Sequence, residues 1–490
     1  MPGGLTKKIG NRNQMAKYNP TIGLEIHAEL KTATKMFCGC VNDPLEKTPN
    51  KNVCPICLAH PGTLPTANKS AVEHMVRIGY ALGGKINEQS QFDRKSYFYP
   101  DLPKGYQISQ YEHPFVKGGN LAGVEITRVH LEEDTARLSH SKDGALVDYN
   151  RAGVPLMELV TEPVIKDAEK ALEFARELQL ILRYLGASDA DMEKGQMRVE
   201  ANVSIAPEGS KELGTKVELK NINSFKAVAS AVAYELERQA KVLEGGGEVV
   251  QETRGWNENK SETFSQRIKE EANDYRYMPE PDLPQVDFSI GEEINLEELK
   301  VSVPELPDDK RKRFTKEYGF KDTVALERMI KDRGEAEFFE EVMSEIGEDK
   351  RLVDTAVNYI DSDLVGLMNK EKVPWGSLKI TPENFGELLV KLQNEEISTR
   401  TAKDVLAKMF ETGADPDNII QEEGLEQVSD EEEIAKIVKE VISENENAVE
   451  DYKRGKETAV KFLIGQAMAK LRGRGNPALL EKLFRENLPK

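Results

Sequence analysis

The stretch Thr21-Ile-Gly-Leu-Glu-Ile-His-Ala-Glu-Leu30 alternates between apolar and polar side chains. Successive side chains of a β-strand point to opposite faces, so this pattern predicts a strand with one apolar face. The opposite face then carries Glu25, His27 and Glu29 together. Charged groups gathered on one strand face are the first indication of a site.

The same alternation recurs at residues 198–206 and 215–220, and helical spacing separates the strands. One predicted helix begins after Asp167, a plausible N-cap, and stops at Gly186. A second runs from about 224 to 243 and ends at Gly245–Gly247. After Asp282 the alternation fades, and from about 296 to 490 most apolar residues recur at helical spacing. The expected fold class is α+β, with a mixed-sheet body followed by an all-helical part.

Length and composition narrow the function classes. A chain of 490 residues predicts about three domains. It has no run of 18 apolar residues that would cross a membrane, and residues 1–18 lack the apolar run of a signal peptide. Four cysteines are too few for a disulfide scaffold, so we expect a cytoplasmic protein with no membrane partner. A net charge of −19 argues against a general nucleic-acid coat.

The charge is unevenly distributed near the C-terminal end. Residues 411–451 hold fifteen acids against two lysines, whereas residues 452–490 hold ten basic residues against three acids. One interpretation is ordinary solvated helix surface. The alternative is a cationic patch that binds a polyanion such as RNA. That patch would consist of Lys453, Arg454, Lys461, Lys470, Arg472 and Arg474.

All the cysteines lie within one short segment, as the pairs Cys38-x-Cys40 and Cys54-Pro-Ile-Cys57. Two close pairs separated by a loop have the spacing of a tetrahedral Zn²⁺ site. Four thiolates would close the coordination shell, so such a zinc ion would be structural. The alternative is a set of buried thiols.

Acidic residues also occur inside apolar runs. Glu158 is the one charge within residues 153–160, and burying a carboxylate costs several kcal/mol unless a cation or hydrogen bonds compensate. Glu25 and the acids of the segment His130-Leu-Glu-Glu-Asp134 also lie in strand-like segments with apolar neighbours. Three such strands could converge on one Mg²⁺, which prefers oxygen ligands. The alternative is a set of unrelated charges at a sheet edge.

The loop at 92–109 combines aromatic and cationic side chains, which suits base stacking with phosphate neutralisation, although aromatic loops also simply pack. Residues 274–282 are similarly mixed. The sequence lacks the phosphate-binding loop G-x-x-x-x-G-K-[ST], the kinase motifs and G-x-S-x-G. These residue patterns therefore indicate sites without naming a reaction. The loop's main members are Arg94, Lys95, Tyr97, Phe98, Tyr99, Lys104 and Tyr106.

Long motifs across these segments resemble the B-subunit family of aspartyl/glutamyl-tRNA(Asn/Gln) amidotransferases. They are GLEIHAEL (23–30), FDRKSYFYPD (92–101), HLEED (130–134), KVELKNINSF (216–225), DYRYMPEPD (274–282) and TPENF (381–385). The resemblance runs in order from about residue 19 to 488. It implies a cradle domain at 1–295, a helical domain at 296–410 and a YqeY-like helical tail at 411–490 that binds tRNA.

The resemblance also implies a heterotrimer with a glutaminase, the A-subunit, and a small C-subunit. This chain would use ATP and Mg²⁺ to phosphorylate the side-chain carboxylate of mischarged Glu-tRNA(Gln) or Asp-tRNA(Asn). Ammonia from the glutaminase would then displace the phosphate. The alternative is a tRNA-binding scaffold whose partner does all the chemistry.

The family motifs place functional residues on this chain. The metal-associated positions correspond to Glu25, His27, Glu158 and one of Glu132 and Glu133. Strand alternation favours Glu132 for the metal and leaves Glu133 for the ammonia path, with the register near 127–128 open. Binding of ATP or the tRNA acceptor end would fall to Arg94, Lys95, Tyr97, Tyr99, Lys104, Tyr106, Asp274 and Arg276.

Overall fold

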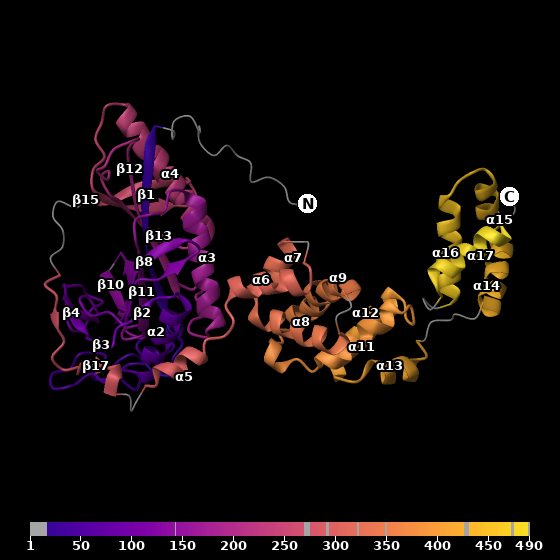
Figure 1. Ribbon diagram of the computed structural model, residues 1–490, viewed down its shortest axis with the longest axis horizontal. Coiled ribbons are helices and arrows are strands. Elements are labelled where there is room, and N and C mark those ends of the chain that lie inside the picture. Colours follow the sequence, from indigo (N-terminus) through magenta and orange to yellow (C-terminus); the bar gives the residue numbers. More distant parts are fainter. Residues whose placement is uncertain are drawn as a thin grey trace. The chain divides into compact units, whose positions relative to one another are not determined.

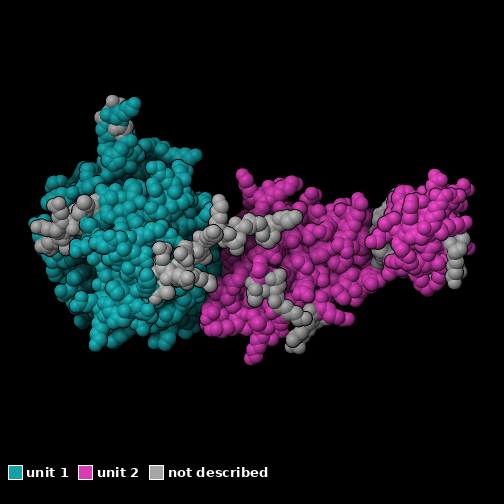
Figure 2. Space-filling model, turned by 90° about the horizontal axis from the view of Figure 1, so that it is seen from above, with its two compact units in different colours: residues 1–307 teal, residues 308–490 magenta. Residues whose placement is uncertain are grey.

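The computed structural model describes residues 17–142, 144–268, 275–290, 294–320, 323–347, 350–425, 431–471 and 475–488. The chain forms two compact units, residues 1–307 and 308–490 (Figure 2). The first is mixed α and β and the second is helical, so the predicted fold class is confirmed. None of the described helices has the length and apolar character needed to cross a membrane.

A ten-stranded sheet forms the centre of the first unit (Figure 1). The predicted strand at 21–30 is its long central strand, and every strand pair in this sheet is antiparallel except β13 with β14. The order is β15 (Glu262–Ile268), β14 (Glu252–Asn257), β13 (Val217–Ile222), β12 (Met197–Pro207), β1 (Tyr18–Glu29), β11 (Pro155–Thr161), β8 (Val124–Glu133), β6 (Val116–Lys117) and β2 (Lys85–Ile86), with β7 (Asn120–Leu121) on β8.

Three helices cover the apolar face of this sheet: α2 (Lys69–Ala81), α3 (Ala168–Tyr184) and α4 (Phe225–Glu244). Figure 1 shows α3 and α4 running along the sheet. The predicted boundaries hold because local signals determine them. Asp167 accepts a hydrogen bond from the amide of Lys170, and Ser224 caps α4 in the same way at Ala227. Gly186 has φ +63°, a conformation that ends α3 at little steric cost.

Short elements surround the large sheet. A three-stranded sheet pairs β16 (Met278–Pro279), β4 (Asp93–Ser96) and β5 (Tyr106–Ser109), and β5 packs against β8. The others are β3 (Gln89–Ser90) with β17 (Val286–Asp287), β9 (Arg137–Ser141) with β10 (Gly144–Asp148), the 3₁₀ turn η1 (Phe288–Ile290) and α5 (Leu296–Val301). The first unit extends past the boundary predicted at 295 because α5 packs against α2.

The second unit begins with a group of packed helices. Their bounds are α6 (Pro307–Glu317), α7 (Thr323–Lys331), α8 (Arg333–Ile346), α9 (Lys350–Asn358), a π-helical segment η2 (Tyr359–Leu364), α10 (Val365–Glu371), a 3₁₀ turn η3 (Trp375–Ser377), α11 (Pro382–Gln393), α12 (Thr399–Thr412) and α13 (Pro416–Glu423). The boundary predicted between residues 410 and 411 falls in the last turn of α12, and α13 packs against α11 and α12.

The last four helices have a hydrophobic core of their own. They are α14 (Glu431–Glu444), α15 (Glu446–Lys453), α16 (Thr458–Lys470) and α17 (Pro477–Asn487). The core combines Ile434 and Val438 of α14 with Leu463 of α16 and Phe484 of α17. We call residues 431–488 the tail from here on, a shorter segment than the tail at 411–490 that the family resemblance implies. Helix α16 buries Val460, Leu463 and Ala467, which recur at helical spacing.

One buried acid in the second unit has an unfavourable environment. Glu335 lies in the first turn of α8 and is only 7% exposed. The pKa of its carboxyl is raised to about 8, mainly by burial and further by the negative charges of Asp361 and Asp332. The positive charge of Arg328 lowers this pKa, but by less. The raised pKa means that the folded protein favours the neutral carboxyl.

We expect Glu335→Gln to stabilise the second unit at alkaline pH, because the amide mimics the neutral acid. Below about pH 4.5 the acid is neutral in both states, so the wild-type penalty develops between pH 4.5 and about 8 and stays constant above. The variant's free energy of unfolding, measured with urea, should exceed that of the wild type by about 2 kcal/mol at pH 9 and by little at pH 5. The exposed control Glu341→Gln on the same helix should change stability by less than about 0.5 kcal/mol. An equal gain at both pH values would contradict the interpretation.

Candidate active site

A polar row crosses four strands of the large sheet at one register. His130 on β8 lies opposite Glu158 on β11, and Glu158 lies opposite His27 on β1. His27 in turn lies opposite Arg198 on β12. Directly paired residues of neighbouring strands share a face. The alternate residues of these strands join the helix-covered core, so the row lies on the other face of the sheet.

Glu158 is at the centre of this row and is 5% exposed. One carboxylate oxygen, Oε2, lies 3.3 Å from Nε2 of His27 and 3.3 Å from Nε2 of His130. Burial alone would raise the pKa of Glu158, but the charges and hydrogen bonds of the two imidazoles outweigh it and lower that pKa well below its usual range. Burial opposes protonation of His27, yet the bond to Glu158 and the nearby acids raise its pKa to about 9. The pKa of His130 is raised as well.

Two further acids flank the row on opposite sides. Oε1 of Glu25 lies 3.8 Å from Nε2 of His27, and Oε1 of Glu132 lies 3.7 Å from the same nitrogen. Oε2 of Glu132 also accepts a hydrogen bond of 3.0 Å from the hydroxyl of Ser109. Burial, followed by the charge of Glu158, raises the pKa of Glu25. We call Glu25, His27, His130, Glu132 and Glu158 the acidic face.

The strand register separates Glu132 from Glu133. Leu156 pairs with Glu132 and Pro155 pairs with Glu133, so Glu132 points to the acidic face with His130. The ladder shifts between Val160 and Thr161, opposite residue 127, which is where the sequence left the register open. Glu133 points elsewhere: it accepts from the ammonium of Lys104 at 2.6 Å and from the amide of Ile108 at 3.0 Å.

The acidic face continues onto β12 and β13 through residues that the sequence did not single out. Glu200 on β12 lies opposite Glu25 on β1. The ammonium of Lys220 on β13 lies 2.6 Å from Glu200 and 3.4 Å from Glu218. Its positive charge lowers the pKa of Glu25 against the larger effect of burial. Lys220 therefore limits the accumulation of negative charge at this end of the site.

The predicted aromatic–cationic loop divides into two groups. Arg94 makes a two-pronged ion pair with buried Glu280 at 2.8 Å and stacks over Tyr106, so it joins β4 to the chain near β16. Lys104 is paired with Glu133. Lys95 has no carboxylate within 4.0 Å among the described residues, and its ammonium lies 5.0 Å from the ring centre of Tyr275. Burial alone would lower the pKa of Lys95, but Glu132 and Glu158 raise it, so this lysine stays charged beside the acidic face.

Several rings surround Lys95. Tyr97 contacts Tyr275 edge-on, and Tyr277 stacks on Tyr111 with the ring centres 4.4 Å apart. Tyr99 is 57% exposed and lies apart from these pairs. Of the remaining predicted residues, Arg276 is exposed in a left-handed conformation with φ +46°, and Asp274 lies outside the described residues.

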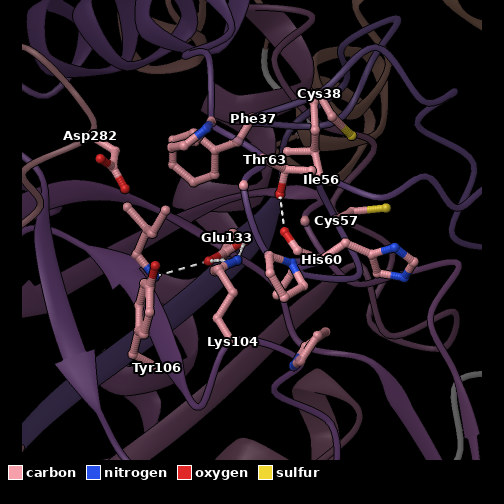
Figure 3. Close-up of a pocket in the computed structure, with 17 residues that line it drawn as sticks. Phe37, Cys38, Ile56, Cys57, His60, Thr63, Lys104, Tyr106, Glu133 and Asp282 are labelled. Atoms are coloured by element: carbon pink, nitrogen blue, oxygen red, sulfur yellow. Dashed lines mark hydrogen bonds and ion pairs between the residues drawn. The ribbon is translucent and has the colours of Figure 1, made fainter.

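A cavity of about 290 Å³ lies between this loop and the cysteine segment. Figure 3 shows Glu133 and Lys104 in contact at its centre, with Tyr106 beside them and Cys38 and Cys57 on the far wall. The other lining residues that Figure 3 labels are Phe37, Ile56, His60, Thr63 and Asp282. The predicted ammonia-path residue Glu133 is therefore a cavity residue, whereas Glu132 belongs to the acidic face.

The four cysteines come together as the sequence predicted. One sulfur each from Cys38, Cys40, Cys54 and Cys57 lies within 4.8 Å of the others, and none forms a disulfide. Hydrogen bonds from Cys38 and from the Cys54 amide, with the charge of Lys35, lower the pKa of the Cys57 thiol to about 5 despite burial. This arrangement can hold a metal ion.

Besides Glu200 and Lys220, the polar residues His130 and Lys35 also escaped the sequence analysis as site members. His130 was visible in the alternation with Glu132, but the ligand set implied by the family resemblance did not include it. Lys35 gave no signal, because nothing in its neighbourhood in the chain marks a lysine that is 1% exposed in the fold.

Two known domain families match most of the chain. The family model described as the GatB/GatE catalytic domain matches residues 20–293, and the GatB domain model matches residues 337–488. The B-subunit of the aspartyl/glutamyl-tRNA(Asn/Gln) amidotransferase of Caldanaerobacter subterraneus is 47% identical over 97% of this chain and all of its own length. The chain belongs to the amidotransferase B-subunit family.

Other B-subunit relatives are equally collinear with the chain. The protein from Persephonella marina is 44% identical over 96% of this chain and 100% of its own length. The protein from Brevibacillus brevis is 43% identical over 97% of this chain and 99% of its own length. The catalytic-domain model of the B-subunit family spans all the strands that carry the acidic face, and the second model spans the tail.

Proposed function

We propose that this chain activates mischarged tRNA by phosphoryl transfer. A side-chain carboxylate oxygen of Glu-tRNA(Gln) or Asp-tRNA(Asn) attacks the γ-phosphorus of ATP, and ADP leaves with the electron pair of the broken bond. Ammonia then displaces the phosphate from the acyl phosphate and forms the amide. The acidic face supports this proposal most directly, because its carboxylates and imidazoles, buried on β8 and β11 and half-buried on β1, would form a site for metal ions and polyphosphate.

The donor set fits a divalent cation. Glu25, His27, Glu132 and Glu158 would hold it, which is the set that the family resemblance implies for Mg²⁺. A bound divalent cation would neutralise charge on the phosphates during transfer. The protein's own contribution is placement: β1, β8 and β11 fix the acids at one register, and Ser109 orients Glu132 by its hydrogen bond.

Lys95 and its surrounding rings would bind the reacting phosphates and an adjacent base. The half-buried ammonium stays charged beside Glu132 and Glu158, where a phosphate oxygen would gain a charged hydrogen bond. The rings of Tyr97, Tyr275 and Tyr277 contact one another beside that ammonium, which lies 5.0 Å from the ring centre of Tyr275. Arg94 and Lys104 support the loop through their ion pairs, and Tyr106 lies over Arg94.

The cavity beside Glu133 would deliver ammonia to the acyl phosphate. Glu133 and Lys104 meet inside it, one residue along β8 from Glu132 of the acidic face. The source of ammonia would be the glutaminase partner, with the small C-subunit completing the assembly. The cytoplasm, where aminoacyl-tRNA is made and used, would be the site of action.

Phosphorylation measured apart from glutamine hydrolysis tests this proposal. The chain is assembled with the glutaminase and the small C-subunit, and the complex is given γ-³²P-labelled ATP with Glu-tRNA(Gln) or Asp-tRNA(Asn) in the absence of glutamine. We expect label in an acyl phosphate on the aminoacyl-tRNA, and amide formation when ammonia is added. Labelling that requires glutaminase activity, or no labelling with either tRNA, would contradict an activity located on this chain.

We also propose that the cysteine cluster binds a structural Zn²⁺. The best support is Lys35, whose buried ammonium lies 3.9 Å from the sulfur of Cys57 and 3.1 Å from the carbonyl oxygen of Tyr149. A buried ammonium needs negative charge nearby. A zinc ion with four thiolates carries a net charge of −2, which satisfies this need.

Replacing Cys54 or Cys57 by serine should remove the metal and destabilise the first unit. Metal analysis of the purified wild type should give about one zinc per chain, and either variant should give almost none. We expect the thermal midpoint to fall by about 5 °C or more, with a smaller effect on the rate of phosphorylation. The control His60→Asn changes the same segment outside the sulfur cluster and should keep the zinc. A metal-free wild type with full stability would contradict the proposal.

A further inference from the structure

The acidic face contains two triads of metal-ligand side chains that share one residue. The first consists of Glu25, His27 and Glu158, and the second consists of His130, Glu132 and Glu158. Within each triad, one donor atom per residue lies within 4.8 Å of the other two. The predicted ligand set covers the first triad together with Glu132, and it leaves His130 without a role.

The strand register relates the two triads by an approximate two-fold rotation about Glu158. β1 and β8 both pair antiparallel with β11, one on each side, so they run parallel to each other. Each contributes a histidine directly opposite Glu158 and a glutamate two residues away. That glutamate precedes the histidine on β1 and follows it on β8. Glu25 therefore lies on one side of the row that contains the two histidines, and Glu132 lies on the other side.

The distances are compatible with metal coordination by both histidines. Nε2 of His27 and Nε2 of His130 each lie 3.3 Å from the same oxygen of Glu158. Two neighbouring ligands of one ion, each bound at about 2.1 Å, are separated by about 3.0–3.5 Å. His130 is 2% exposed and its Nδ1 has no hydrogen-bond partner among the described residues. An imidazole buried with one nitrogen unpaired is expensive unless the other nitrogen has a strong partner.

We propose that the acidic face binds two divalent cations bridged by Glu158, with His130 as a ligand of the second. Each ion would receive one imidazole nitrogen and two carboxylates, leaving positions for phosphate oxygens. Imidazole is uncommon around Mg²⁺ and common around transition metals, so this donor set favours Mn²⁺ over Mg²⁺. The inference rests on the proposed phosphoryl transfer, for which paired ions would bind the attacking and leaving oxygens together.

Binding of Mn²⁺ to the assembled complex of this chain with its glutaminase and small partners tests the proposal. We expect two Mn²⁺ per chain at the acidic face and an electron paramagnetic resonance spectrum of a magnetically coupled pair. His130→Asn should leave one ion with the six-line spectrum of isolated Mn²⁺. The control His140→Asn removes an exposed histidine of β9 and should keep two coupled ions.

Glu132→Gln provides a second test if His130→Asn misfolds. It removes a different member of the second triad and should also abolish the coupled spectrum, while glutaminase activity and thermal unfolding report on assembly and folding. A wild type that binds one uncoupled Mn²⁺, or a folded His130→Asn that keeps the coupled pair, would overturn the proposal. Labelling of aminoacyl-tRNA is measured in parallel: single-ion binding with normal labelling rejects only the ion pair, whereas paired ions without labelling reject only the proposed reaction.

Discussion

Glu158→Gln should reduce ATP-dependent phosphorylation of Glu-tRNA(Gln) by about 10³-fold or more, while glutamine hydrolysis by the glutaminase partner continues. Glutamine has the shape of glutamate, so it should fit between β1 and β8 without a cavity. It lacks the negative charge that both imidazoles and any bound cation require. Loss of metal-assisted charge neutralisation is worth several kcal/mol, and each 1.4 kcal/mol changes the rate about tenfold.

Single-turnover labelling from γ-³²P ATP measures this effect directly. The control Glu169→Gln removes an equal charge from the exposed first turn of α3 and should leave the rate within about twofold. Binding of tRNA should be close to wild type for both variants, and thermal unfolding checks that each complex is folded. A chain that acted only as a scaffold would tolerate glutamine at position 158, so normal labelling by a folded Glu158→Gln complex would favour the scaffold hypothesis.

The sequence predicted the helices and long strands of the first unit because local chemistry determines them. Asp167 marks the start of α3 and Gly186 marks its end. The alternating segment at 21–30 lies largely inside β1. These signals need only neighbouring residues, and they carry over to the fold because the large sheet buries one face under three helices. The change of periodicity after Asp282 likewise marked the start of the helical part.

The assignment of Glu132 required the pairing of strands. Alternation within 124–133 predicts that Glu132 and His130 share one face of the strand. A β-bulge, however, would move every residue that follows it to the opposite face. The shift opposite residue 127 does occur, and it leaves the segment from Arg128 to Glu133 in continuous register with β11. The residue pairs that fix this register lie more than twenty positions apart in the chain, so no local pattern contains them.

Long-range ion pairs explain what the sequence did not reveal. Arg94 has the composition expected of a phosphate-binding loop, yet its guanidinium is held by Glu280, 186 residues later in the chain. Lys35 reaches the cysteine cluster and the carbonyl of Tyr149 only after the chain folds back on itself. A cation's role depends on whether another residue already neutralises it, and that information belongs to the tertiary structure.

The tail shows the same effect on its basic residues. Lys470 contacts Glu440 and Glu444 of α14 at 3.0 and 2.8 Å, and Arg454 contacts Glu450 at 3.3 Å. The acidic segment thus neutralises part of the basic end that follows it. Lys453 and Lys461 are exposed and have no ion pair among the described residues. Arg472 and Arg474 lie outside the described residues.

Removing the tail should raise the KM for aminoacyl-tRNA by about tenfold or more while leaving glutaminase activity and assembly largely intact. The truncation is best made after Leu425, since a cut near 410 would remove the last turn of α12 and the buried residues of α13. The tail has its own core, so its loss should not unfold the helices that precede it. A tenfold change corresponds to about 1.4 kcal/mol, which a few phosphate contacts supply at moderate salt.

Two double variants separate free cations from neutralised ones. Lys453→Ala with Lys461→Ala should lower the slope of log affinity against log salt concentration by about 1.5–2, since each lost phosphate contact lowers it by about one. The matched pair Arg454→Ala with Lys470→Ala should change the slope less, because glutamates already neutralise both side chains. Equal slopes for the two pairs would show that ion pairing within the tail does not determine which cations bind tRNA. A truncated complex that binds aminoacyl-tRNA as tightly as the intact one would show that the basic end is only solvated surface.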